Sequence, residues 1–161
     1  FTSGIDSTYD SYVFKFINIH TSVDDADFTM NFSTDGGSNY NVTKTSTYFF
    51  AYLSEDNNFQ DFRYEAPFDL AQSTGFQIIN NSLGASNDNS CSGFLTLSNP
   101  SSTTFVKHFT AESNSLRNVL AIGYHSFVGG YANTTNAINA VQFKMSSGNI
   151  DDGIIKMYGV S

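Results

Sequence analysis

The stretch Asp27-Phe28-Thr29-Met30-Asn31-Phe32-Ser33 alternates apolar and polar side chains from one residue to the next. Because successive side chains of a β-strand point to opposite faces of a sheet, this period of two predicts a strand with one buried and one exposed face. Phe28, Met30 and Phe32 are expected to face the core. The segment 35–39 follows with two glycines and predicts a turn, since glycine accepts a positive φ without steric cost.

Similar segments recur along the chain, separated by stretches rich in Gly, Asn, Ser and Asp. The segment 12–19 has little polar interruption, which predicts a strand buried on both faces. Gly129-Gly130 suggests a turn or a bulge, and a slip in the alternation within 137–145 suggests another bulge. The remaining expected strands cover residues 40–52, 76–79, 93–98, 103–111, 119–128, 137–145 and 154–160.

This succession of short strands predicts an all-β fold, a jelly-roll-like antiparallel β-sandwich of about 8–10 strands. The chain has 161 residues, enough to bury a core, and no linker or fixed repeat divides it, so residues 1–161 are expected to form a single domain. In a jelly roll the last strand often lies beside the first, which would bring the termini together. Residues 1–5 look like the tail of a strand, so an N-terminal arm or first strand is expected upstream of Phe1.

Composition limits the classes of partner. With 16 Phe, 9 Tyr and no Trp, aromatic rings are expected to be the main core material. The net charge of −8 repels phosphate backbones and anionic lipid headgroups, so neither a nucleic acid nor a membrane is expected as a partner. No apolar run approaches the roughly 18 residues that a membrane-spanning helix needs. Cys91 is the single cysteine, which rules out an intrachain disulfide and is interpreted as an incidental thiol.

No segment presents a catalytic constellation, so the chain is not expected to be an enzyme. His20, His108 and His125 lie far apart and in no metal-ligand spacing. Each is expected to make a cross-strand hydrogen bond or to be exposed. A nucleophile elbow of the Gly-x-Ser-x-Gly type is absent from the sequence.

The acidic cluster formed by Asp24, Asp25 and Asp27 is a candidate calcium site, because calcium prefers several oxygen ligands. The alternative is a loop that is acidic only because it is solvated. No other cofactor is expected.

The segment 53–73 is the least regular of the chain and is expected to be a long surface connection with a short helical turn near 68–72. It combines carboxylates with aromatic rings, among them Phe59, Phe62, Tyr64 and Glu65. These four side chains are candidates for binding a glycan through ring stacking and hydrogen bonds to hydroxyl groups. Two alternatives stay open: the rings anchor the connection to the sheet below, or two carboxylates act in glycoside hydrolysis.

Several longer segments carry a resemblance to a known family. They are residues 9–20 (YDSYVFKFINIH), 46–49 (STYF), 99–109 (NPSSTTFVKHF), 130–135 (GYANTT), 142–150 (QFKMSSGNI) and the tail 153–160 (GIIKMYGV). Together they resemble a family of small virion-associated structural proteins of marine tailed bacteriophages, including cyanophages, which end in a G-x-IKLYG-like strand. The resemblance implies a β-sandwich protein at the surface of a phage particle. Its implied partners are the major capsid protein or other virion proteins, and further copies of itself in a homo-oligomer such as a trimer.

Two roles are compatible with this resemblance. The expected role is a capsid decoration (cement) protein on the head surface, non-enzymatic and located in the virion. The alternative is a tail-fibre or adhesin module that binds host-surface carbohydrate.

Overall fold

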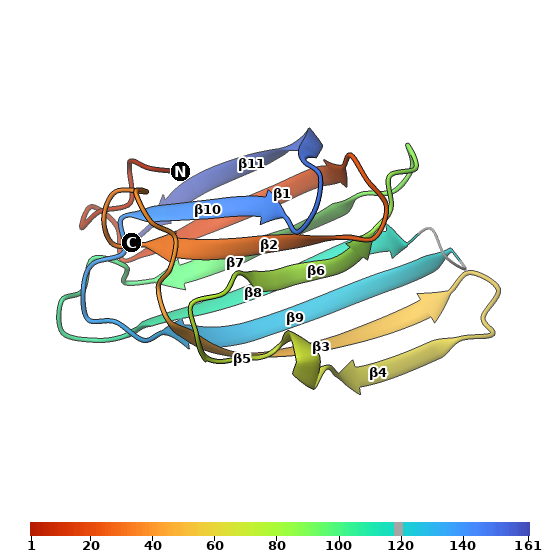
Figure 1. Ribbon diagram of the computed structural model, residues 1–161, viewed down its shortest axis with the longest axis horizontal. Coiled ribbons are helices and arrows are strands. Elements are labelled where there is room, and N and C mark those ends of the chain that lie inside the picture. Colours follow the sequence, from red (N-terminus) through yellow and green to blue (C-terminus); the bar gives the residue numbers. More distant parts are fainter. Residues whose placement is uncertain (118–120) are drawn as a thin grey trace.

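The computed structural model describes residues 1–117 and 121–161, and Figure 1 shows two layers of β-strands that face each other. The described residues form eleven strands and one 3-10 helix. The predicted all-β antiparallel sandwich is therefore confirmed, with slightly more strands than the expected number of about 8–10. In this part of the chain, no helix is long and apolar enough to cross a membrane.

Each of the expected strands overlaps a strand of the structure, but residues 1–5, expected to be the tail of a strand, form no strand. The expected strand 119–128 corresponds to β9, and its residues 119 and 120 lie outside the described residues. In chain order the elements are β1 (Ser11–Thr21), β2 (Ala26–Ser33), β3 (Lys44–Ser54), β4 (Gln60–Tyr64), η1 (Ala66–Phe68), β5 (Leu70–Ser73), β6 (Gln77–Leu83), β7 (Cys91–Ser98), β8 (Lys107–Arg117), β9 (Ile122–Ala132), β10 (Ala140–Met145) and β11 (Ile150–Val160).

The two layers are unequal. Within the described chain, the large sheet has eight strands, in the order β11-β1-β7-β8-β9-β3-β4, with β5 also paired to β3. The small sheet has the order β10-β2-β6, and all neighbouring strands in both sheets are antiparallel. The last strand, β11, lies beside β1, as expected for a jelly roll, and Figure 1 shows both termini at the same end of the molecule.

Aromatic rings fill the space between the layers, as the composition predicts. Phe16 of the large sheet contacts Phe28 and Phe143 of the small sheet, with ring centroids 5.0 and 5.1 Å apart. Phe32 and Phe109 make a similar contact between the sheets at 5.4 Å. These edge-to-face contacts are the preferred geometry for aromatic pairs, and each contributes about 0.5–1.5 kcal/mol beyond the area it buries.

The burial of β1 and β2 is the reverse of the sequence-based prediction. β1 alternates, with Phe14 and Phe16 buried, Lys15 exposed and Ile17 38% exposed. One face of the large sheet packs against the small sheet while the other remains open, so β1 is buried on one face only. The polar side chains of β2, Thr29, Asn31 and Ser33, are instead buried. The loop after β2 also folds back over its end, where Asn31 Nδ2 donates to the Tyr40 carbonyl at 2.7 Å.

The segment 53–73 is more ordered than the sequence predicts. β4 and β5 both pair with β3, so most of the expected surface connection belongs to the large sheet. The helical turn lies at 66–68 rather than near 68–72. β4 escapes prediction because all five of its residues are exposed, so it carries no buried-face pattern that stands out from the charged residues around it.

Neither expected bulge is present. Gly129 and Gly130 continue the regular pairing of β9 with β3 and β8, and β10 pairs with β2 without a register shift. A Cβ atom on Gly130 would lie 2.5 Å from the Thr45 carbonyl oxygen. A glycine at this position therefore lets β9 and β3 approach each other closely. The irregularity of β1 lies elsewhere, between Ile17 and His20, where Asn18 has a φ of 50°.

Two lysines are buried at one end of the core. Lys44 and Lys107 both pair with Ala132, from β3 and β8 on either side of β9. The Lys44 ammonium donates to Asn31 Oδ1 at 2.6 Å and to the Val42 carbonyl at 2.8 Å, and burial lowers the pKa of Lys44 to about 7. The bond to Asn31 joins the two sheets, and both bonds offset part of the cost of burying the lysine.

Candidate functional site

The candidate site lies on the outer face of the large sheet, defined as the face turned away from β10, β2 and β6. Along β1 the outward side chains are the exposed ones, and Phe94 on β7 is 37% exposed. β11 contributes Ile154 and Tyr158 to the same face, at 52% and 46% exposed. This face therefore presents apolar and aromatic side chains to solvent across a broad sheet, which is a frequent mark of an interaction surface.

Strand register aligns one continuous row of side chains across this face. Each member is the direct cross-strand partner of the next, and the row runs through Lys156, Lys15, Phe94, Glu112, Phe127, Phe49 and Tyr64. Neighbouring strands lie about 4.8 Å apart, so the row spans about 29 Å. We call it the outer-face row.

The aromatic half of the outer-face row is held by ring stacking. Phe49 and Phe127 lie 4.8 Å apart with 11° between their planes, and His125 stacks on Phe127 at 4.2 Å and 7°. Phe62 contacts Phe49 edge-on at 5.6 Å. The rings of Phe62, Phe49, Phe127 and His125 thus support one another at one side of the face. We call them the aromatic ridge.

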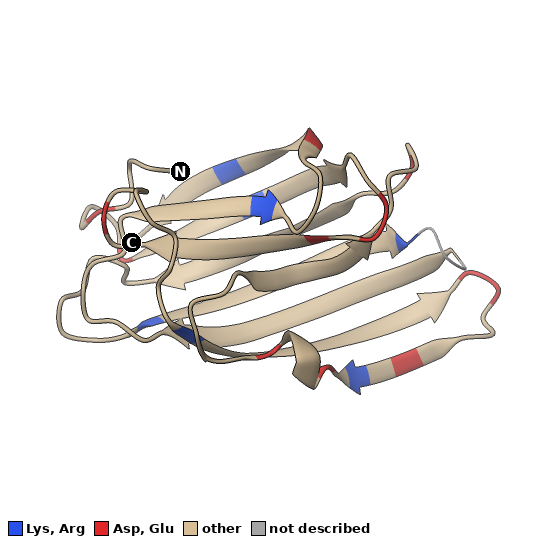
Figure 2. Cartoon of the chain, viewed as in Figure 1, with Lys and Arg blue, Asp and Glu red and all other residues tan. Residues whose placement is uncertain are grey.

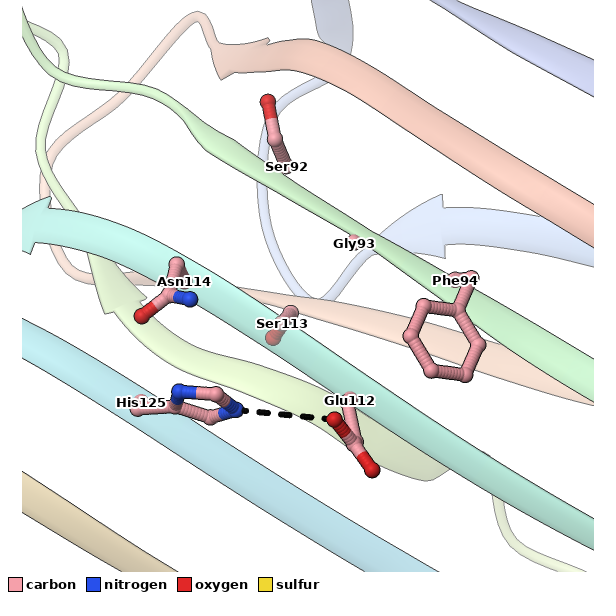
Figure 3. A pocket seen from close by; sticks show the side chains of 7 residues that line it. All are labelled: Ser92, Gly93, Phe94, Glu112, Ser113, Asn114 and His125. Atoms are coloured by element: carbon pink, nitrogen blue, oxygen red, sulfur yellow. Dashed lines mark ion pairs between the residues drawn. The ribbon is translucent and has the colours of Figure 1, made fainter.

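A shallow hollow borders this ridge, and Figure 3 shows the side chains around it. The hollow is shallow, with a volume of about 70 Å³, and is open to solvent. The backbone of β7 and β8 forms its floor at Gly93 and Ser113, because the side chain of Ser113 points into the core. The outward side chains around it come from β7, β8 and β9: Ser92, Phe94, Glu112, Asn114 and His125.

His125 and Glu112 do not form a direct hydrogen bond with each other. His125 Nε2 lies 3.8 Å from Glu112 Oε2, which is too far for a hydrogen bond, and the two side chains are 35% and 44% exposed. Among the described residues, Nε2 has no hydrogen-bond partner. The hollow therefore offers an imidazole, a carboxylate, an amide, a hydroxyl and one aromatic ring within a small space.

The structure separates the four predicted glycan contacts. Phe62 and Tyr64 lie on β4 on the outer face, 69% and 59% exposed, and Phe59 lies just before β4 at 49%. Glu65 follows β4, and its position in the alternation is that of Arg63, whose Nε lies 3.7 Å from the Glu65 carboxylate. Phe62 thus belongs to the aromatic ridge and Tyr64 to the outer-face row, whereas Glu65 belongs to neither.

The rings of β4 do not anchor a loop, which was the alternative interpretation, because β4 is itself a strand of the sheet. The Tyr64 hydroxyl donates to Asp69, and this hydrogen bond fixes the ring beside the next turn of the chain. The edge-on contact of Phe62 with Phe49 leaves much of its ring exposed.

Two of the three aspartates considered for calcium accept hydrogen bonds from backbone amides. Asp24 Oδ1 accepts a hydrogen bond from the Ala85 amide at 2.7 Å, and Asp27 Oδ1 accepts one from the Ser82 amide at 3.0 Å. Burial raises the pKa of Asp27, and Asp25 has a φ of 57° in the turn between β1 and β2. Within residues 1–117 and 121–161, no group of three or more His, Cys, Asp or Glu side chains is arranged to hold a metal ion. The geometry gives the calcium interpretation no support.

His20 and His108 behave as the sequence predicts, whereas His125 is only partly exposed and its Nε2 has no hydrogen-bond partner among the described residues. His20 Nδ1 shares a 2.7 Å hydrogen bond with Asp151, which raises the pKa of His20, and its Nε2 lies 3.1 Å from the Ser86 carbonyl. His108 is exposed near Tyr131 on the neighbouring strand. Cys91 is fully buried, and burial raises the pKa of its thiol to about 12, which fits an unreactive thiol.

Sequence reasoning missed the hollow because its side chains come from three strands. Phe94, Glu112 and His125 are separated by many residues along the chain and meet only through the register of β7, β8 and β9. The local signal was the alternation of each strand, which assigns Phe94 and Glu112 to an outward face without placing them together.

Comparisons of the chain with protein-family models, with curated proteins and with solved structures found no match. The resemblance to phage virion proteins therefore stays a prediction from the sequence, and the geometry of the outer face is the basis on which a function can be argued.

Proposed function

We propose that this chain is a non-enzymatic structural protein of a bacteriophage virion, and that it acts as a capsid decoration (cement) protein on the head surface. The sequence resemblance suggests that the protein belongs to a phage particle. The observation that carries the proposal is the free edge of the large sheet at β11.

β11 is suited to strand addition by a neighbouring subunit. It runs over Ile150–Val160 at the end of the large sheet, and its strand neighbour in the described chain is β1. None of its residues is fully buried, and Ile154, Tyr158 and Val160 are 52%, 46% and 46% exposed. A long exposed edge with apolar side chains is a template for pairing with another chain, and proteins that do not use such an edge usually block it.

Such an edge would let the sandwich bind the shell as a rigid unit. The core is continuous between the sheets, so force applied at β11 passes directly to β1 and the large sheet. A decoration protein stabilises a capsid because it binds the assembled lattice and not the free subunits. Copies placed around a local symmetry axis would form the implied homo-oligomer, with the major capsid protein as the partner.

The experiment compares phage particles with and without this protein. Particles from which it has been deleted or stripped are expected to release DNA at a lower temperature or after a milder osmotic shock, and adding back the purified chain is expected to restore resistance. Equal resistance of the two kinds of particle would refute the cementing role.

A second candidate, a tail-fibre or adhesin module, is favoured by the exposed rings of Phe59, Phe62 and Tyr64. Copy number separates the two roles. A decoration protein is expected at an abundance comparable with that of the major capsid protein, whereas an appendage protein is expected at an abundance comparable with that of other tail proteins. Quantitative mass spectrometry of purified particles measures this ratio.

A further inference from the structure

We propose that the hollow between Phe94 and His125 binds one sugar ring of a neutral glycan. The ring would pack against Phe94, and its hydroxyl groups would be hydrogen-bonded by Glu112, Asn114 and His125. This assignment goes beyond the decoration role and does not depend on whether the protein sits on the head or the tail.

The hollow combines an aromatic ring with polar side chains. A sugar ring has an apolar face of C–H groups and a rim of hydroxyls that both donate and accept hydrogen bonds. Phe94 supplies an exposed aromatic surface, Glu112 supplies acceptors, and the Asn114 amide supplies both a donor and an acceptor. Small-ligand sites combine an apolar wall with a few converging polar groups in this way.

His125 and Glu112 have hydrogen-bonding capacity that the protein does not use. The gap of 3.8 Å between Nε2 and Oε2 is too long for a direct hydrogen bond, and the described residues offer Nε2 no other partner. A hydroxyl group that accepts from the imidazole and donates to the carboxylate would satisfy both groups after small side-chain movements. Nε2 is buried without a partner among the described residues, which is costly while the site is empty, whereas the Glu112 side chain is 44% exposed and is open to water.

The side chains and the floor of the hollow are held in place before any ligand binds. His125 is stacked on Phe127, which is stacked in turn on Phe49, so the imidazole plane is held by two neighbouring rings. The floor consists of strand backbone at Gly93 and Ser113. A Cβ atom on Gly93 would lie 2.1 Å from the Glu112 carbonyl oxygen, so this glycine lets β7 and β8 approach closely beneath the hollow. Little ordering is therefore needed on binding, which favours affinity.

The negative charge of the chain favours a neutral glycan over an acidic one. The chain carries a net charge of −8, and Figure 2 shows Asp and Glu in the loops and near the strand ends around the sheets. This field repels polyanions at long range and leaves neutral sugars unaffected. Glu112, inside the hollow, adds a local repulsion against a carboxylate or a sulfate.

The size of the hollow limits the ligand to a short contact. At about 70 Å³ it is far smaller than the usual pocket for a drug-sized molecule, of about 300–1,000 Å³. We expect it to seat one edge of a single ring against Phe94, with neighbouring rings of the same glycan along the outer-face row. In one direction they would meet Lys15, the cross-strand partner of Phe94, and in the other the aromatic ridge of Phe127 and Phe49.

The experiment uses the purified chain on an array of neutral, N-acetylated and acidic oligosaccharides. Binding to at least one neutral or N-acetylated class is expected. Isothermal titration calorimetry with the best-bound oligosaccharide then measures the affinity for the unchanged protein and for Phe94→Ala and Asn114→Ala. Each substitution is expected to weaken binding by about tenfold or more, because each removes a ring contact or a hydrogen bond to the sugar.

Phe105→Ala is the matched control. Phe105 is 69% exposed, against 37% for Phe94, and does not line the hollow, so its removal deletes an exposed ring without touching the site. Affinity is expected to be unchanged, and thermal unfolding confirms that each variant is folded. Asn114→Ser provides a second probe of the same position if Asn114→Ala does not fold.

Three results would overturn the proposal: no neutral or N-acetylated glycan bound, binding of acidic glycans alone, or an affinity that Phe94→Ala and Asn114→Ala leave unchanged. None of them would affect the cementing role, which is measured on whole particles.

Discussion

The rings of Phe49 and Phe127 lie parallel on neighbouring strands, with centroids 4.8 Å apart and 11° between their planes. Both rings are on the outer face of the large sheet and are half-buried, although the described residues place no second sheet over this face. They are cross-strand partners in the register of β3 and β9, so their contact ties the exposed face together at the point where the aromatic ridge meets the hollow.

We expect these two rings to be energetically coupled. A double-mutant cycle with Phe49→Ala and Phe127→Ala is expected to show a coupling free energy of about 0.5–1.5 kcal/mol, typical of aromatic pairs. Urea unfolding of the four proteins measures it. The matched control is a cycle with Phe49→Ala and Phe94→Ala, two rings of the same row separated by Phe127 and Glu112, for which the coupling is expected to be near zero. Equal coupling in both cycles would contradict a direct stacking contribution.

Two adjacent glycines of β9 are expected to differ sharply in their tolerance of a methyl group. A Cβ atom on Gly130 would lie 2.5 Å from the Thr45 carbonyl oxygen and 2.9 Å from Ser46 Cα, whereas a Cβ atom on Gly129 would have no atom within 4 Å. Gly130→Ala is therefore expected to lower the free energy of unfolding by about 2 kcal/mol or more, because the strands must move apart. Gly129→Ala is expected to be neutral or stabilising. Similar losses for both variants in urea unfolding would show that the close approach is not specific to Gly130.

The buried Lys44 is expected to make stability depend on pH. Its pKa is lowered to about 7 in the folded chain and returns to 10.5 on unfolding, so above pH 7 the unfolded chain binds more protons at this residue than the folded chain does. Stability should therefore rise with pH from about 7 to about 9, by about 2 kcal/mol for this group alone. Below pH 7 the residue is charged in both states and contributes no slope.

Lys44→Met tests this assignment by removing the titrating group. The pH profile of the free energy of unfolding is expected to be flatter in the variant. Asn31 Oδ1 keeps its hydrogen bond from the Phe32 amide, so Lys44→Met does not leave that oxygen without a donor. A slope as steep as that of the unchanged protein would assign the pH dependence to other groups, such as Lys107, whose pKa is also lowered by burial.

His20 and Asp151 should produce the opposite dependence. The hydrogen bond with Asp151 raises the pKa of His20, so this contribution to stability is fully present below the unfolded value of 6.5 and is lost as the pH rises through the higher folded value. Because Asp151 is 44% exposed, solvent screening limits the effect to a few tenths of a kcal/mol up to about 1 kcal/mol. Asp151→Asn is expected to lower stability at pH 5.5 and to change it little at pH 8.5. Equal losses at the two pH values would indicate a neutral hydrogen bond instead.

The sequence predicts the strands well because each carries its own local pattern. The segment that became β2 alternates in every residue, and the aromatic composition anticipates the core contacts of Phe16 with Phe28 and Phe143. What the pattern could not give is the face that each strand buries. β1 is the more apolar strand yet has an open face, because burial depends on which layer lies over it and not on its own residues.

The candidate site was predictable only in part, for the same reason. Phe62 and Tyr64 were found because they lie close together among carboxylates in one segment of the sequence, and the structure exposes both rings. Phe94, Glu112 and His125 were missed because the register between strands is a long-range property that no short segment contains. The buried state of Lys44 was missed as well, since its partner Asn31 lies on the other sheet.

A density map of the intact phage particle, with this chain located in it, tests the central claim most directly. We expect the sandwich in symmetric clusters on the head, with β11 against a neighbouring subunit and the outer face of the large sheet turned to solvent. A chain found only in the tail, or one whose β11 edge contacts no other subunit, would contradict the account.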